Sequence, residues 1–531
     1  MLNKLRHRPG IVIALVLLWK AILLVFTAQP VPANDSFFYD GAVVNWWWHG
    51  QYCNPSLANA LPISGREIFT AYPPLYQFVL WGWLQGAGPS ALAVMWLHFL
   101  LFALYAGLLL AALRELRVPA GAVHFASLFL LGITFHDRPD SLAHVWGMTA
   151  VWAWARAYRT ASGPGKFQSS SRWLWLAAGS VVLCLATSLQ IGGIYFLLIS
   201  LGLWLGPRAM PARLPAVVWT GMLMLPVLLM AGVKFGQPQW WAGFQEHARQ
   251  TPSLTSWRLP DLLEIIKIVR SVPGLLLVLA LLPMAGWGGR PNEPDAADPR
   301  QKTILLAASL AAVAVLLLAL CFLTANLVLI AAYLQPLVVG VFLAQWAAGK
   351  IPRWQTHAVK LVLVLAVLLV SVRAIGLTTV GVACARDVDY AAARSAVARE
   401  LAALPEDAVV GVSAAYLYDA WPEARRLRLI HSDWFGPARK DQPHAAMDAL
   451  RAAKPACLIL TQFDYYRRYT HLLAWLASSG DSASARVENL AHVLPPDASP
   501  RWQRVVQHVA WAPVIVTLTW REGPPAANPP D

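Results

Sequence analysis

Long apolar segments separated by short polar ones run through residues 1–383. A membrane-spanning helix needs roughly 20 apolar residues, or about 17 at the short end. A shorter apolar stretch at 73–85 is too brief to span, and we expect it at the membrane interface. Two of the spans share 172–206, where Gly192-Gly193 predicts a break. Eleven segments qualify as spans: 11–28, 91–113, 119–135, 141–158, 172–189, 191–206, 214–233, 272–289, 303–323, 325–347 and 358–380.

Composition supports this pattern. The chain is 57% hydrophobic and only 13% charged, about half the charged fraction of soluble domains, which excludes an ordinary globular enzyme. The net charge of +14 resembles that of a nucleic-acid-binding protein. However, residues 384–531 hold equal numbers of basic and acidic residues, so the surplus belongs to the membrane portion. Lys and Arg gather there in cytoplasmic loops, and we expect no nucleic-acid partner.

The distribution of Lys and Arg between loops predicts the orientation. With the N-terminus inside, the cytoplasmic loops receive more than twice as many basic residues as the outer loops, as expected for a membrane protein. We interpret the basic start and first apolar run as an uncleaved first helix. An odd number of spans then places the C-terminus outside. Lys20 and Arg373 lie within spans, and snorkelling to the interface is their simplest explanation.

The chain is therefore predicted to be an α-helical polytopic membrane protein with two domains. Residues 1–383 form the transmembrane domain, and residues 384–531 form an extracytoplasmic α/β domain. In the second domain we expect strands at 408–413 and 457–461, and helices at 391–403 and 445–453. The expected location is the bacterial inner (plasma) membrane.

Three outer loops hold nearly all the candidate chemistry: 29–74, 136–140 and 234–270. The first carries Asp35 and Asp40, and loops this long are usually functional. The second carries Asp140. A carboxylate at the hydrocarbon boundary marks a polar cavity or a paired site, although Asp140 before Ser141 is also a good helix N-cap. Arg138 beside it can bind phosphate oxygens in a bidentate fork.

The five cysteines form no CxxC pair and no Cys/His cluster at metal-ligand spacing. Compartment alone permits a bridge between Cys53 and Cys384, and we favour unpaired thiols.

Several short motifs together resemble those of the GT-C fold glycosyltransferases, specifically the protein-mannosyltransferase and aminoarabinose-transferase-like group. The first outer loop opens with Asn34-Asp35-Ser36-Phe37-Phe38-Tyr39 and ends with Tyr72-Pro73-Pro74-Leu75-Tyr76. Arg138-Pro139-Asp140-Ser141-Leu142-Ala143 is similar to the group's second acidic motif. Thr187-Ser188-Leu189-Gln190-Ile191-Gly192 looks like its later polar break, and Tyr333-Leu334-Gln335-Pro336-Leu337 resembles its Tyr-Leu-x-Pro segment.

The resemblance implies an integral membrane transferase that moves a sugar from a polyprenyl-phosphate donor to a lipid, glycan or protein acceptor on the outer side. It assigns catalytic roles to Asp35 and Asp140. Several positive charges common in the group are missing, at Tyr72, Ser188 and Ala332. Substrate binding is therefore expected to fall on the following residues: Tyr39, Arg66, Tyr72, Arg138, Lys234 and Arg249. No organic cofactor is expected, and a divalent metal is compatible with the two carboxylates.

Two alternatives stay open. The first is a transporter or flippase of a lipid-linked sugar, although such proteins tend to show internal repeats and midplane charges, whereas polar residues here concentrate in outer loops. The second is a catalytically silent member that binds an envelope partner.

Overall fold

We analysed a computed structural model of the 531-residue chain. The chain divides into two compact units. Unit 1 comprises Met1–Ile22, Tyr72–Tyr76 and His98–Gly376, and unit 2 comprises Leu23–Ala71, Gln77–Leu97 and Leu377–Asp531. The structure describes residues 10–27, 34–57, 61–70, 72–133, 139–161, 167–205, five positions within 221–232, 234–250, 266, 271–281, 299–322, 325–348, 353–386, 390–431, 450–461, 464–465, 482–489 and 513–520.

Apolar helices make up most of the described chain. Four of them are long and apolar enough to cross a membrane, within Ala91–Glu115, Ser170–Thr187, Ile330–Ala347 and His357–Gly376. The protein is thus an α-helical membrane protein. The helices are α2 (Ile11–Thr27), α5 (Leu75–Ala87), α6 (Ala91–Glu115), α7 (Ala120–Leu128), η2 (Phe129–Gly132), α8 (Asp140–Ala161), α9 (Phe167–Thr187), α10 (Leu189–Leu205), α12 (Pro238–Gln250), α14 (Pro273–Leu281), α15 (Pro299–Phe322), α16 (Ala325–Ala348) and α17 (Arg353–Arg386).

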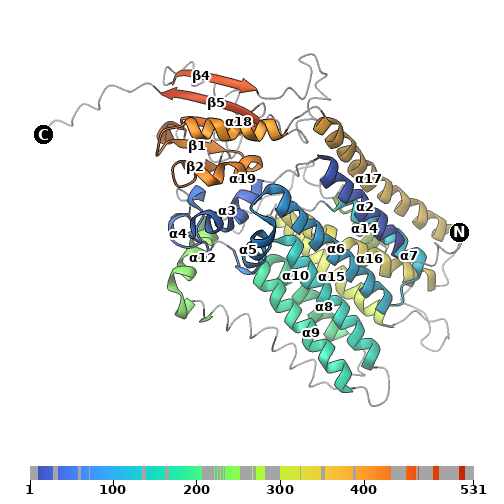
Figure 1. The fold of residues 1–531 in the computed structure, drawn as a ribbon. Coiled ribbons are helices and arrows are strands. Elements are labelled where there is room, and N and C mark those ends of the chain that lie inside the picture. The colour runs from blue at the N-terminus through green and yellow to red at the C-terminus, as the bar shows by residue number, and fades with distance from the viewer. Residues whose placement is uncertain are drawn as a thin grey trace. The chain divides into compact units, whose positions relative to one another are not determined.

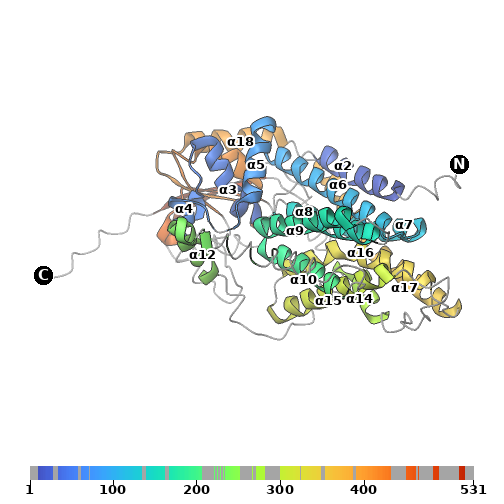
Figure 2. The same ribbon diagram turned by 90° about the horizontal axis from the view of Figure 1, so that it is seen from below.

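Most predicted spans coincide with these helices, while most of 214–233 and the end of 272–289 lie outside the described residues. The total of eleven spans stays a prediction. In unit 1, α8 packs on α9 and α10, and α15 packs on α10 and α16. Figures 1 and 2 show these helices running side by side. The apolar stretch at 73–85 forms the short helix α5.

The break between α9 and α10 lies at Ser188, which corrects the predicted position at Gly192-Gly193. Gly192 is instead helical, and a Cβ there would approach the Leu185 backbone to 2.6 Å. The glycine is needed because the two helices come together tightly just past the break. Gly147 of α8 serves the same purpose, because a Cβ there would lie 2.1 Å from the Tyr195 ring of α10.

Lys20 is buried in unit 1. Its Nζ donates hydrogen bonds to the carbonyl oxygens of Ile133 at 2.6 Å and Leu131 at 3.3 Å, and lies 5.4 Å from the centre of the Phe102 ring. These carbonyls end η2, where a helix leaves acceptors without partners in its own backbone. Lys20 therefore caps a neighbouring helix instead of snorkelling.

We expect Lys20→Met to destabilise the protein by about 2 kcal/mol, because two buried carbonyls lose their donor. Thermal unfolding of the detergent-purified protein measures the change. Lys360→Met on the exposed surface of α17 is the matched control and should unfold like the unmodified protein. Equal unfolding temperatures for the two variants would contradict the capping role.

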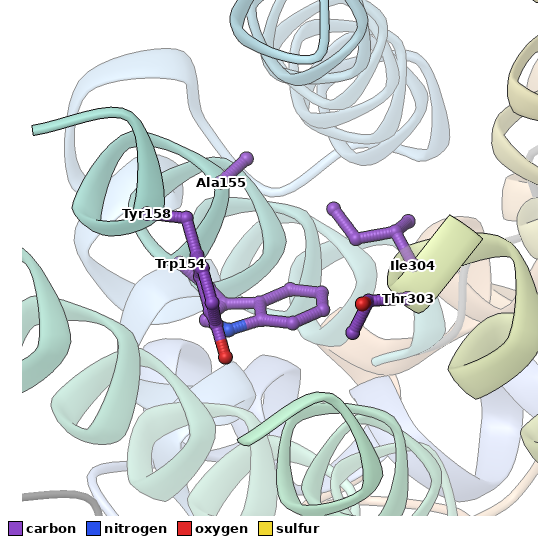
Figure 3. Close-up of a pocket in the computed structure, with 5 residues that line it drawn as sticks. All are labelled: Trp154, Ala155, Tyr158, Thr303 and Ile304. Carbon is purple, nitrogen blue, oxygen red and sulfur yellow. The ribbon is translucent and has the colours of Figure 1, made fainter. Parts of the chain in front are cut away.

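The end of α8 away from Asp140 carries an ion-pair group. Glu115 accepts from Arg156 at 2.6 Å and from Arg159 at 3.0 Å, and Arg156 also lies over the Trp173 ring. A crevice beside it is lined by Trp154, Ala155, Tyr158, Thr303 and Ile304 (Figure 3), and it has no room for a water molecule. The described residues at this end of the bundle are therefore closely packed and form no candidate site.

Unit 2 contains a mixed five-stranded sheet in the order β2-β1-β3-β5-β4. Strand β1 pairs in parallel with β2 and β3, whereas β5 pairs antiparallel with β3 and β4. Its core contains Leu450, Leu458, Leu460, Val514 and Val516. The strands are β1 (Val409–Val412), β2 (Arg428–His431), β3 (Cys457–Thr461), β4 (Ser482–Asn489) and β5 (Pro513–Trp520), with α18 (Tyr390–Ala403) packing on β5.

The predicted α/β character of this region is confirmed, as are the predicted strands that became β1 and β3 and the helix that became α18. Of the helix predicted at 445–453, only the final turn from residue 450 lies within the described residues.

The first outer loop folds as part of unit 2. It forms α3 (Asn34–His49), η1 (Pro55–Leu57) and α4 (Pro62–Arg66). The loop closes on α3 through Asn45, whose amide donates to the Gln51 carbonyl at 2.9 Å, and Trp46 stacks on Trp81 of α5 at 4.6 Å between ring centres. The described part of this loop is therefore folded, and its helix α3 contains both Asp35 and Asp40.

Candidate active site

Asp140 begins α8 in unit 1, with its side chain partly exposed. The Ala143 amide donates to the Pro139 carbonyl at 3.0 Å, so Pro139 holds the N-cap position of the backbone and Asp140 is the first residue inside the helix. The N-cap interpretation is thus wrong by one residue. A carboxylate in the first turn still interacts favourably with the positive end of the helix dipole.

Hydroxyl and imidazole groups surround the start of α8. The Tyr333 hydroxyl lies close to the side chains of Ser141 and Asp140. Ser141 Oγ lies 3.3 Å from His98 Nδ1, and His98 Nε2 lies 3.0 Å from the Tyr76 hydroxyl. A continuous chain of hydrogen-bonding groups therefore runs from the bundle to the helix end that carries Asp140.

His144 extends this polar region one turn further along α8. Its ring stacks on Tyr333 with 3.8 Å between centres and 8° between planes, and its Nδ1 lies 3.1 Å from the Tyr195 hydroxyl. Tyr105 donates its hydroxyl hydrogen to the Tyr333 carbonyl. His144 Nε2 is buried and has no hydrogen-bond partner in the described part of the chain. We call the following residues the α8 polar cluster: Tyr76, His98, Ser141, His144, Tyr195 and Tyr333.

A double-mutant cycle tests the contact between His144 and Tyr195. We expect His144→Phe to destabilise by about 1–3 kcal/mol, because it leaves the buried Tyr195 hydroxyl without its partner. Combining it with Tyr195→Phe should restore part of that loss, with a coupling energy of about 1 kcal/mol. Chemical unfolding of the four proteins measures the cycle, and strictly additive effects would mean that the two groups do not interact.

Asp35 and Tyr39 lie on α3 in unit 2. The Asp35 side chain lies outside the described residues, although its backbone is helical. Tyr39 is buried, with its ring against the edge of Phe38 at 5.5 Å between centres. Asp35 and Asp140 belong to different units, so their approach to each other stays a prediction, as does substrate binding by Tyr39.

The remaining binding candidates are distributed over both units. Arg66 is exposed in the last turn of α4, and Tyr72 is partly exposed. Lys234 is exposed and lies 5.6 Å from the ring centres of Phe235 and Trp241. The side chains of Arg138 and Arg249 lie outside the described residues. The binding roles of all five residues stay predictions.

The described cysteines and acidic residues limit the disulfide and metal chemistry of the chain. Cys53, Cys184 and Cys457 are free, buried thiols, so the alternative bridge between Cys53 and Cys384 is absent. Burial raises the pKa of Cys457 to about 12, with the Glu400 charge adding to the effect, and this thiol is therefore protonated and unreactive at neutral pH. Within the described ranges, no three His, Cys, Asp or Glu side chains gather closely enough to hold a metal ion. That a divalent metal is compatible with Asp35 and Asp140 stays an expectation from the sequence.

The sequence motifs contain Tyr76, Ser141 and Tyr333 of the α8 polar cluster, but sequence reasoning missed His98, His144 and Tyr195. His98, His144 and Tyr195 each stand alone in an apolar helix, and a lone polar residue in such a helix gives no indication of its partner. A signal was nevertheless present, because ionisable residues within spanning helices are functional candidates by default.

No family model matches the chain, and no curated protein matches it in sequence. Among solved structures, the chain is similar to ArnT from Cupriavidus metallidurans bound to undecaprenyl phosphate, at 15% identity and a TM-score of 0.49 over 95% of this chain and 98% of that one.

Two further solved structures are similar at the same level. An oligosaccharyltransferase from Archaeoglobus fulgidus tethered to an acceptor peptide shows 10% identity and a TM-score of 0.49, over 86% of this chain and 69% of that one. Arabinofuranosyltransferase AftD from Mycobacteria shows 15% identity and a TM-score of 0.47, over 96% of this chain and 40% of that one.

Proposed function

We propose that the protein is an integral membrane glycosyltransferase that uses a polyprenyl-phosphate sugar as donor and works on the extracytoplasmic side. The observation that carries the proposal is Asp140, a carboxylate at the start of α8 with the hydroxyl of Ser141 next to it and that of Tyr333 close by. The Asp140 carboxylate is partly exposed and can accept hydrogen bonds from sugar hydroxyls. It lies within the Arg-Pro-Asp-Ser-Leu-Ala motif that resembles the second acidic motif of GT-C enzymes.

The proposed reaction is a single displacement at the anomeric carbon. Asp35 takes the proton from the acceptor hydroxyl, whose oxygen forms the new bond to the sugar as the bond to the donor phosphate breaks. The product sugar is inverted, and the polyprenyl phosphate leaves with the bonding electron pair. Cationic groups that stabilise charge on the leaving phosphate lower the barrier to this step, and Arg66, Arg138, Lys234 and Arg249 are the proposed sources.

Asp140 is proposed to orient the reacting groups. The partly exposed carboxylate can accept hydrogen bonds from sugar hydroxyls, and the buried side chains of Ser141 and Tyr333 lie beside it. The aromatic and imidazole groups behind them hold Tyr333 in place: it stacks on His144, and Tyr105 bonds its backbone. Preorganisation of this kind supplies catalysis without reorganisation during the reaction.

Purified protein in detergent or nanodiscs tests the proposal with radiolabelled polyprenyl-phosphate sugars and a panel of lipid, glycan and peptide acceptors. Release of free polyprenyl phosphate together with a labelled acceptor is expected. In proteoliposomes, movement of the intact donor across the bilayer without cleavage would identify a transporter instead. Binding of an envelope protein with no turnover on any acceptor would identify a silent member.

A further inference from the structure

Helix α3, which carries Asp35, is attached to the C-terminal part of unit 2 at two points. The Tyr418 hydroxyl donates to Asp40 Oδ2 at 2.9 Å. At the end of the helix, the His49 ring lies with Nε2 3.3 Å from the Trp421 carbonyl oxygen. Arg425 also donates to the His49 carbonyl oxygen at 3.1 Å. All these groups belong to one compact unit, although more than 370 residues separate the partners in sequence.

Asp40 sits on the buried side of α3. It is fully buried, together with Ala42, Val43 and Val44, and Tyr418 is 6% exposed. Burying a carboxylate is costly unless hydrogen bonds compensate it, so the Tyr418 hydroxyl is part of what allows Asp40 to occupy this position. Asp40 is therefore directed into the protein, away from any soluble substrate, in contrast to what its place in the acidic pair of the first loop suggests.

The His49 imidazole ring is neutral where it contacts the Trp421 carbonyl oxygen. Burial lowers the pKa of His49, and the Arg425 charge lowers it further, while the hydrogen bond to the Trp421 carbonyl acts in the opposite direction. A neutral imidazole with its hydrogen on Nε2 can donate to that carbonyl at neutral pH. The loop that follows α3 also packs on this helix, because the Asn54 side chain lies 2.5 Å from where a Cβ on Gly41 would be.

We propose that Asp40 and Tyr418 form a positioning contact through which the C-terminal domain holds the helix that carries Asp35. Both are positioning residues. Asp35 lies five residues before Asp40, about 7.5 Å along the same helix axis, and α3 is attached again at His49. A helix that is held at two points also has its first turn, which contains Asp35, held in position. The inference rests on the proposed function, because it assigns the C-terminal domain a part in placing the proposed base.

Substitutions at Asp40 separate a positioning role from a chemical one. Asp40→Asn keeps an oxygen that accepts the Tyr418 hydrogen but removes the charge, whereas Asp40→Leu removes the acceptor. We expect kcat to fall at least about tenfold in Asp40→Leu and in Tyr418→Phe, with the donor KM almost unchanged. The reason is that misplacing a reacting group by about 1 Å can lower the rate about a hundredfold. Asp40→Asn should retain kcat within about threefold, and the double variant Asp40→Leu/Tyr418→Phe should be no slower than Asp40→Leu.

Hydrogen exchange of α3 provides a readout that does not depend on turnover. In Tyr418→Phe, which removes a single oxygen atom, amides of residues 34–49 should exchange faster. Thr517→Val is the matched control, because it removes a hydroxyl that bonds Glu400 at 3.3 Å in the same domain, and it should leave both kcat and α3 exchange unchanged.

Two results would overturn the inference. One is an Asp40→Asn variant as slow as Asp40→Leu, which would mean that the charge of Asp40 takes part in the chemistry. The other is a Tyr418→Phe variant with normal kcat and normal α3 exchange. Failure of the proposed function gives a different result from both. Full turnover by Asp35→Asn would show that Asp35 is not the base, whereas the exchange experiment would still report whether Tyr418 holds α3.

Discussion

Asp35→Asn should abolish sugar transfer, with a loss of at least about 10³-fold in kcat, because an amide cannot take the proton of the acceptor hydroxyl. The substitution preserves the size of the side chain at the start of α3, so insertion and folding should not change. The measurement is turnover of a labelled polyprenyl-phosphate sugar by the purified variant, with donor KM determined in parallel.

Two controls make the Asp35 result interpretable. Thermal unfolding and size-exclusion behaviour should match those of the unmodified protein. The pH profile of the residual activity should lose the limb that reports ionisation of the base. Near-normal turnover by Asp35→Asn would refute the assignment of Asp35 as the general base.

Asp140→Asn is expected to lower kcat/KM by about 10²–10³-fold, the size of effect seen when one preorganised group in an active site is lost. The amide keeps the helix start intact but removes the charge beside the hydroxyls of Ser141 and Tyr333. Steady-state kinetics over a range of donor concentrations measures the loss.

An interpretation in which Asp140 only stabilises the start of α8, through the helix dipole, makes the opposite prediction. Under that interpretation Asp140→Asn would cost a few tenths of a kcal/mol of stability and leave kcat/KM close to normal. Asp140→Ser is the companion variant, because serine is also favourable at the start of a helix. If Asp140→Ser is stable and fully active, the carboxylate has no catalytic role.

The helical part of the fold was largely predictable from the sequence because spanning helices need long apolar segments. The predicted span at 91–113 became α6 (Ala91–Glu115), and the one at 325–347 became α16 (Ala325–Ala348). The sheet was less predictable. Buried strands such as β3 read as short apolar runs, whereas β2 (Arg428–His431) and β4 (Ser482–Asn489) are short or polar and owe their conformation to neighbours in the sheet.

In the candidate site, too, features with a local sequence signal were predictable and long-range contacts were not. Asp140 was predictable as a site residue because placing a carboxylate beside hydrocarbon costs free energy unless a partner or water compensates it. The partners of α8 could not be found in this way, because the contact between His144 and Tyr195 joins residues 51 positions apart. The contact between Asp40 and Tyr418 spans 378 positions, and no local pattern in the sequence indicates it.

Lys20 has a consequence for how the chain is assembled during synthesis. Its two carbonyl ligands belong to residues that are translated more than 110 positions later. When α2 leaves the ribosome, the Lys20 ammonium group therefore lacks these two carbonyl ligands. Stable release of α2 into lipid should wait until the segment ending at Ile133 arrives, so α2 should complete its integration late.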